Sequence, residues 1–207
     1  MSNLDSYARF SSDNPLLDFT FLYPADWQAI EIKGKEKAYT EVFIRGPRNA
    51  ENTYSLSLVV RVMPISEKEG RWVDLKAVAA DYVAKSKGLA GFREVSRAEG
   101  RLADVEAIEI EMGYMMPLPL NAVNPKKTQI IERKVFLKRG SYFYELAYTA
   151  VEEDYYKYLD AFRNASRTLE FREEEANRQV YWSVVSPASA HAVHEKPTEY
   201  KAQGKKG

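Results

Sequence analysis

Two histidines and a glutamate near the C-terminus have the spacing of a metal site. In the stretch HAVHE, His191, His194 and Glu195 stand at positions i, i+3 and i+4, so a helix would bring them to one face. Imidazole nitrogens and a carboxylate are ligands that zinc and copper accept, and so small a set would bind them weakly. The alternative is a solvated tail in which the two histidines occur by chance.

Acidic residues cluster at two further places. Glu109 and Glu111 alternate in a strand-like stretch and point to the same side, while Glu152, Glu153 and Asp154 follow one another. Neighbouring carboxylates could serve in acid–base catalysis or hold a hard cation such as calcium or manganese. The alternatives are a solvated sheet face for the first pair and an ordinary helix start for the second cluster.

Basic residues gather between positions 126 and 139. The candidates for partner binding are these cations and one exposed aromatic residue: Lys126, Lys127, Arg133, Lys134, Lys138, Arg139 and Tyr156. Such a patch would suit an acidic protein or the charged surface of a membrane protein complex. The alternative is a solvated strand face. Tyr142, Tyr144 and Tyr148 lie on one strand face, and we expect them in the core.

The remaining inventory does not favour an enzyme. The chain has no cysteine, no glycine-rich phosphate loop and no HExxH motif, and both histidines lie near the C-terminus. Lys and Arg together number 30, as do Asp and Glu, which argues against nucleic acid as a partner. No apolar run approaches the roughly 18 residues of a transmembrane helix. We expect a cytoplasmic protein if Met1 is the native start, and a thylakoid-lumen or periplasmic one if a targeting segment has been removed.

The elements that would position these residues follow from apolar periodicity. Alternation predicts strands in residues 18–24, 39–47, 54–63, 92–114 and 130–149, with a hairpin turn at Gly140. A period of 3.6 predicts helices in residues 71–88 and 149–165. Asp74 and Gly88 would cap the first helix, and Thr149 with Glu152 would form a capping box for the second. Residues 115–127 are expected to form a proline-punctuated loop.

This order of elements predicts three segments and an α+β fold with helices packed on an antiparallel sheet. Residues 1–16 would be an N-terminal arm, residues 17–172 the domain, and residues 173–207 a partly disordered C-terminal extension. The stretch QVYWSVV, residues 179–185, is apolar within that extension. It would either dock on the parent domain or bind a partner.

Three stretches in order resemble the PsbP family, which comprises the extrinsic photosystem II protein and its bacterial and plastid relatives. FTFLYPADWQ, residues 19–28, is similar to the family opening GFSFLYP-x-x-W. SLSLVVRVMPIS, residues 55–66, matches a family strand and places Pro64 correctly. Residues 132–171 follow the C-terminal pattern, with Tyr156 and Lys157 at its aromatic step.

The resemblance implies an α/β/α sandwich around a central antiparallel sheet, without enzymatic activity. It also implies binding to a larger photosynthetic membrane complex, such as the oxygen-evolving photosystem II, that the protein helps to assemble or stabilise. One alternative is a module that binds a small ligand or a calcium or manganese ion. Another is a binder of small GTPases, because the same fold occurs in a Ran-binding factor. The histidines that photosystem II members carry within the domain are missing here, and the extension after Phe171 departs from the family pattern.

Overall fold

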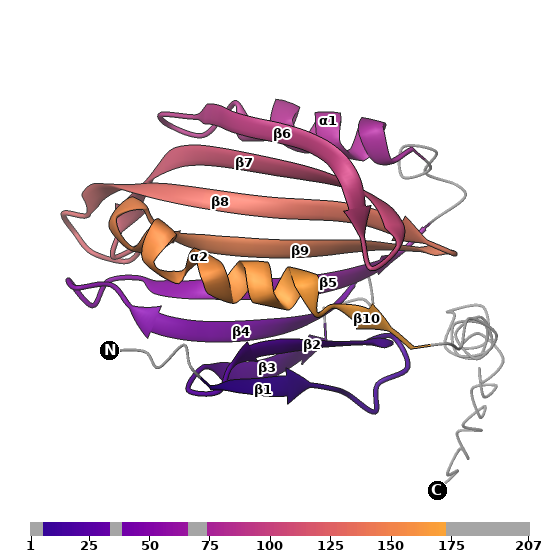
Figure 1. Cartoon of the computed structure of the whole chain (residues 1–207). Helices are drawn as coiled ribbons and strands as arrows, with labels where there is room; N and C mark the ends of the chain where they lie inside the picture. The colour runs from indigo at the N-terminus through magenta and orange to yellow at the C-terminus, as the bar shows by residue number, and fades with distance from the viewer. Residues whose placement is uncertain (1–5, 34–38, 66–73, 173–207) are drawn as a thin grey trace, which may run out of the picture. The chain divides into compact units, whose positions relative to one another are not determined.

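The computed structural model describes residues 6–33, 39–65 and 74–172. In chain order its elements are β1 (Tyr7–Phe10), β2 (Phe19–Pro24), β3 (Gln28–Lys33), β4 (Thr40–Arg48), β5 (Ser55–Pro64), α1 (Leu75–Ser86), β6 (Arg93–Leu102), β7 (Val105–Leu118), β8 (Lys126–Arg139), β9 (Tyr142–Val151), α2 (Glu152–Arg167) and β10 (Glu170–Phe171) (Figure 1). Neither of these helices is long and apolar enough to cross a membrane.

A seven-stranded sheet forms the centre, with strands in the order β3-β4-β5-β9-β8-β7-β6. All of its neighbouring strands pair antiparallel (Figure 1). A smaller sheet has the order β1-β2-β10 and is also antiparallel. The predicted antiparallel α+β fold is therefore confirmed. The hairpin turn between β8 and β9 is confirmed too, since Gly140 has a φ of +55°.

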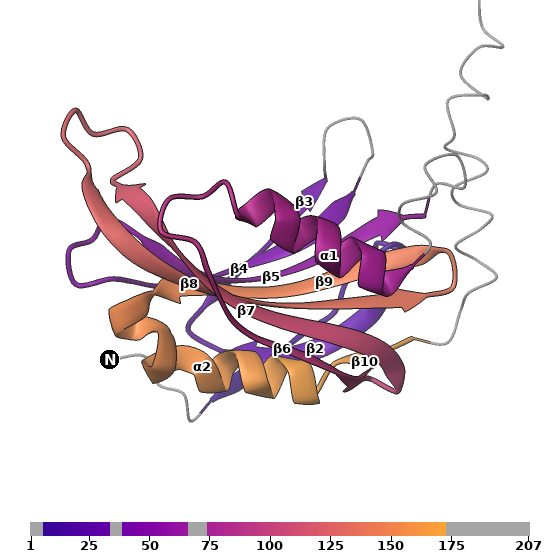
Figure 2. The same cartoon turned by 90° about the horizontal axis from the view of Figure 1, so that it is seen from above.

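The two helices lie on opposite faces of the main sheet (Figure 2). Helix α1 packs Val78 and Val83 against Ile108 and Ile110 of β7. The residue that follows Ile110 in the strand, Glu111, accepts a hydrogen bond on the other face of the sheet from Tyr155 of α2. Because neighbouring residues of a strand point to opposite faces, β7 contributes to both layers of an α/β/α sandwich.

Helix α2 buries an aromatic stripe. The predicted stripe residues Tyr155, Tyr158, Leu159 and Phe162 are all buried, and the Tyr155 ring lies 5.2 Å from that of Tyr148 on β9. These aromatic side chains join the helix to the sheet. Their burial is the main source of stability for this layer.

The stretch after β2 is fixed by Trp27. Its backbone N–H donates to the carbonyl of Pro24 at 3.0 Å, which closes the turn. The buried indole meets Tyr158 of α2 edge to face, with ring centroids 6.3 Å apart. The opening motif therefore ties the first strands of the chain to its last helix.

The start of α2 differs from the expected capping box. Thr149 belongs to β9, opposite Glu132 of β8, and the N-cap is Val151, which makes no side-chain cap bond. The predicted cap was wrong because β9 is paired on both sides, which keeps Thr149 in the ladder. At α1 the expectation is confirmed in that the Asp74 side chain accepts from the Lys76 N–H at 2.9 Å.

Two other element boundaries differ from the prediction. Residues 115–118, expected in a loop, continue β7 because they pair with residues 126–129 of β8. Residues 7–10, assigned to the arm, pair with β2 from Tyr7↔Pro24 to Phe10↔Phe21. The Phe10 and Phe21 rings stack at 5.2 Å, so apolar burial draws this segment into the fold. The C-terminal extension lies outside the described residues.

Candidate functional site

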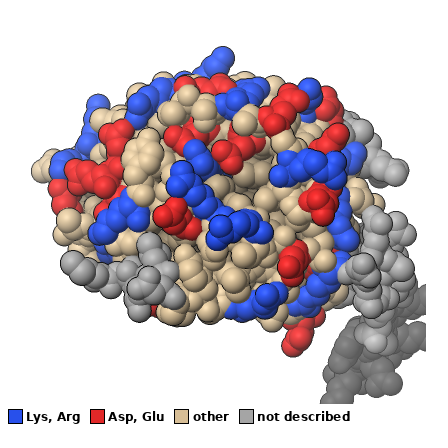
Figure 3. Space-filling model, viewed as in Figure 1, with Lys and Arg blue, Asp and Glu red and all other residues tan. Residues whose placement is uncertain are grey.

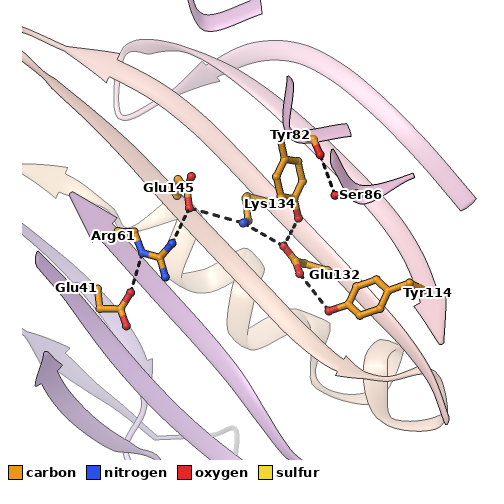
Figure 4. Close-up of polar contacts among 8 residues, drawn as sticks. All are labelled: Glu41, Arg61, Tyr82, Ser86, Tyr114, Glu132, Lys134 and Glu145. Atoms are coloured by element: carbon orange, nitrogen blue, oxygen red, sulfur yellow. Dashed lines mark hydrogen bonds and ion pairs between the residues drawn. The ribbon is translucent and has the colours of Figure 1, made fainter. Parts of the chain in front are cut away.

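A row of alternating charges crosses four strands on the sheet face that α1 packs against (Figure 4). We call these five residues the charge ladder: Glu41 of β4, Arg61 of β5, Glu145 of β9, and Lys134 and Glu132 of β8. The strand register produces the row, since Glu41 pairs with Arg61 and Arg61 pairs with Glu145.

The contacts along the charge ladder range from 2.8 to 3.7 Å. Arg61 Nε donates to Glu41 Oε2 at 2.8 Å, and its Nη1 lies 3.7 Å from Glu145 Oε2. Lys134 Nζ lies 3.6 Å from the same Glu145 oxygen and 3.2 Å from Glu132 Oε1. The Arg61 guanidinium stands 4.6 Å above the Tyr39 ring. Each cation therefore bridges two carboxylates.

Two tyrosines close the Glu132 end of the ladder. Tyr82 of α1 donates to Glu132 Oε1, and Tyr114 of β7 donates to Oε2 at 3.4 Å (Figure 4). Burial raises the pKa of both phenols, and the charge of Glu132 raises it further. The hydroxyls thus stay protonated and act as donors. They are not poised to serve as bases near neutral pH.

The guanidinium of Arg61 stays protonated, because its pKa is raised. Burial lowers the pKa of its guanidinium, but the hydrogen bond to Glu41 and the charge of Glu145 outweigh burial and leave this pKa raised. The ladder has three carboxylates and two cations, and the two phenol hydroxyls supply the remaining donors. Its groups satisfy one another and do not converge on one open point, so the arrangement suits a structural role.

A second polar cluster lies on the opposite face, beneath α2. Glu111 is buried, and its carboxylate accepts from Tyr155 at 2.9 Å and from Arg133 Nε at 2.9 Å. Glu109 Oε1 lies 3.6 Å from Arg133 and is more exposed. The predicted solvated face is therefore wrong for Glu111, because α2 covers that end of the strand.

The predicted basic residues do not form one surface. Strand alternation sends Lys134 and Lys138 toward the α1 face and Arg133 and Arg139 toward the α2 face. Lys134 is only 13% exposed, within the charge ladder. Lys126 binds Glu51 at 2.6 Å, outside the ladder. On the α2 face, cations and anions are interspersed (Figure 3).

Arg139 has a structural partner near the N-terminus. Its Nη1 donates to the buried Asp18 carboxylate at 2.9 Å, and Tyr144 donates to the other oxygen at 3.0 Å. The guanidinium also lies 4.8 Å from the Phe171 ring. Arg139 therefore joins β8 to both ends of the domain and is not available as a surface cation.

The predicted metal ligands have no counterpart in the described residues, which contain no group of three or more His, Asp or Glu arranged to hold a metal ion. His191, His194 and Glu195 lie outside those residues. A surface depression of about 180 Å³ is lined by residues of β6, β7 and β8 and by Ser166 of α2. It is smaller than the roughly 300–1,000 Å³ that drug-sized ligands occupy.

Comparisons with known proteins agree on the architecture. Cyanobacterial PsbP (CyanoP) from Synechocystis sp. PCC 6803 superposes with a TM-score of 0.51 at 12% identity, over 82% of this chain and 94% of that chain. This chain has the PsbP-like fold. LpqN, involved in cell envelope biogenesis of Mycobacterium tuberculosis, superposes with a TM-score of 0.54 at 13% identity, over 81% and 91% of the two chains.

A third structure also shares the PsbP-like fold. Protein PA94 of Pseudomonas aeruginosa, of unknown function, superposes with a TM-score of 0.52 at 14% identity, over 81% of this chain and 99% of that chain. No family model and no curated protein matches the sequence. At these identities the comparisons establish the fold alone.

Among the described residues of this PsbP-like fold, three large apolar side chains are more than 60% exposed. Tyr156, as predicted, points outward from α2 and is 72% exposed. Leu120 and Val123, in the turn between β7 and β8, are 67% and 96% exposed. Sequence patterns alone did not single out Leu120 or Val123. Their signal was the uncharged, proline-bounded stretch that precedes Lys126.

Proposed function

We propose that this protein is a non-catalytic binding protein that attaches to a larger protein complex and helps to assemble or stabilise it. The observation that carries the proposal is the exposure of Tyr156, Leu120 and Val123. The centres of protein interfaces are more apolar than their rims, enriched in aromatic side chains and poor in charged ones. Exposed side chains of this kind gain free energy when a partner covers them.

The internal pairing of the charged groups supports the same proposal. In the charge ladder and in the Glu111 cluster, each cation lies against carboxylates of neighbouring strands. Catalysis by these groups would need at least one of them to face a bound substrate with a free donor or acceptor. The charged clusters instead stabilise the scaffold, and the exposed apolar side chains are left for recognition.

The PsbP-like fold and the sequence resemblance extend the proposal to the kind of complex. A photosynthetic membrane complex, reached from the lumenal or periplasmic side, is the partner that the resemblance favours. The protein itself would bring no cofactor to it. The charged contribution to docking would come from residues such as Lys127, which is exposed, since Lys134 and Arg139 are engaged within the domain.

Affinity capture tests the proposal. The full tagged chain would be expressed in its native cells, cross-linked reversibly and recovered with its partners. We expect one discrete protein complex, and we expect Tyr156→Ala to lower its recovery about tenfold, as for an interface residue worth 1–2 kcal/mol. Lys76→Ala, a change at an exposed cation on α1 across the sheet, is the control and should leave recovery unchanged.

A thermal-shift series with millimolar calcium, manganese or zinc tests the competing metal-binding function. A ligand that binds only the folded state raises the melting temperature by mass action. We expect no shift with any of the three ions. A clear shift together with an empty capture experiment would replace the accessory-protein proposal by the metal-binding one.

A further inference from the structure

The turn between β7 and β8 presents an uncharged apolar surface. Residues 119–127 are all exposed, and from Pro119 to Pro125 none of them is charged. Leu120 and Val123 are the most exposed aliphatic side chains in the described part of the chain. Figure 2 shows the turn projecting from the ends of β7 and β8. We call residues 119–125 the apolar tip.

The apolar tip is held in place from below. Leu118 is 3% exposed and packs in a cluster with Tyr114, Ile130 and Val151. The pairs Pro117↔Lys127 and Leu118↔Lys126 continue the ladder to its base. The hydrophobic anchor is therefore separate from the exposed side chains above it.

The conformation of the apolar tip is also restricted from within. The Ala122 N–H donates to the carbonyl of Pro119 at 3.1 Å, which closes a turn. Pro119 and Pro125 each fix one φ angle and lack an N–H group, so the segment resists extension into a strand. A preordered loop loses little conformational entropy on binding, which favours recognition.

We propose that the apolar tip is the main docking element of this protein and that Leu120 and Val123 insert into an apolar pocket on a partner protein. The inference rests on the proposed function and names the surface that performs it. Burial of two aliphatic side chains would supply the apolar centre of the interface, and the polar residues at the base of the turn would form its rim.

The charges at the base of the tip favour a protein partner over a lipid surface. Lys126 is bound to Glu51, and these two residues line a small depression with Glu152 and Glu153. Attraction to anionic lipids needs a local excess of cations, whereas the carboxylates here offset Lys126 and Lys127. The tip itself carries no tryptophan or tyrosine, the residues that anchor proteins at a membrane interface.

The test compares the full chain with the double variant Leu120→Ser/Val123→Ser. Each would bind the protein recovered by wild-type capture, after that protein has been identified and purified. We expect the double variant to bind at least tenfold more weakly while its melting temperature stays unchanged, because both side chains are exposed. Val95→Ser alters another exposed aliphatic residue, on β6 between the pairs Glu94↔Met112 and Ser96↔Glu111, and should leave affinity unchanged.

The other outcomes overturn the inference in distinguishable ways. If the double variant binds the captured partner as tightly as wild type does, the tip is not the docking element. The proposed function would still stand in that case. If wild type binds vesicles of phosphatidylcholine and phosphatidylglycerol and the double variant does not, the tip docks on a lipid surface and not on a protein. If wild type forms concentration-dependent dimers and the double variant does not, the tip docks on a second copy of this chain. A wild-type chain that captures nothing would sink both proposals.

Discussion

Two carboxylates on the same face of β7 differ in burial and in their hydrogen-bond partners. Glu111 and Glu109 both approach Arg133, but Glu111 is buried and also accepts the hydroxyl of Tyr155. Burial of the guanidinium lowers the pKa of Arg133, but the hydrogen bond to Glu111 and the nearby negative charges outweigh burial and leave this pKa raised. Removing Glu111 would leave a half-buried cation and a buried hydroxyl short of a partner, whereas removing Glu109 would not.

We therefore expect Glu111→Ala to lower the free energy of unfolding by about 3 kcal/mol, near the low end for buried pairs because Arg133 keeps Glu109. Glu109→Ala, the matched control, should cost less than about 1 kcal/mol because its side chain is 35% exposed. Urea unfolding at neutral pH measures both. Equal losses for the two variants would show that α2 does not cover Glu111 as described.

At the scale of elements, strand β4 is irregular near its C-terminal end, next to Trp27. Its register with β5 shifts between Arg45 and Arg48, and Gly46 lies in that irregular stretch beside the Trp27 ring. A Cβ on Gly46 would lie 2.3 Å from Leu56 Cδ2 and 3.1 Å from Trp27 Cε2. Glycine is needed there because the Leu56 side chain and the Trp27 indole both approach the backbone closely.

Gly46→Ala should therefore destabilise the protein by about 1–3 kcal/mol, since buried Leu56 and Trp27 must shift together. Gly100→Ala is the control, because no atom lies within 4 Å of its added Cβ on edge strand β6. That change should be neutral or stabilise by up to about 1 kcal/mol. Chemical denaturation with tryptophan fluorescence as the signal compares them. A neutral Gly46→Ala would mean that the turn adapts without loss.

Across the whole molecule, tyrosine hydroxyls hold the helices to the sheet. Tyr82 reaches from α1 to Glu132, and Tyr155 reaches from α2 to Glu111. Burial, followed by nearby charges or hydrogen bonds, raises the pKa of five phenols: Tyr54, Tyr82, Tyr114, Tyr148 and Tyr155. The folded chain therefore keeps protons that the unfolded chain releases above pH 10 or so.

The sign of this linkage predicts alkaline unfolding. The stabilisation is fully present below the unfolded phenol pKa of about 10 and is lost as pH rises above it, by about 1.4 kcal/mol per pH unit for each phenol that stays protonated. Chemical unfolding between pH 8 and pH 12 should show this decline. In the double variant Tyr82→Phe/Tyr155→Phe the free energy of unfolding should fall less steeply with pH. An unchanged slope would contradict the raised pKa of these two phenols.

Local sequence signals accounted for much of the scaffold. Alternation in residues 54–63 gave β5 its buried face, and the glycine at position 140 placed the hairpin because a tight turn needs positive φ. Periodicity also identified the buried stripe of α2. The start of that helix was missed because strand pairing of Thr149 with β8 overrode its capping preference.

The sequence by itself determined both helices, most of the long strands, the aromatic stripe of α2 and the outward position of Tyr156, but not the pairing of β1 or the extension of β7. Only the tertiary structure decided what the charged residues do. Arg139 and the buried Asp18 are 121 positions apart, yet they form an ion pair, and the charge ladder depends on the register of four strands. The physical reason is that periodicity and turn preference are local properties, whereas the partner of a charge is set by strand pairing.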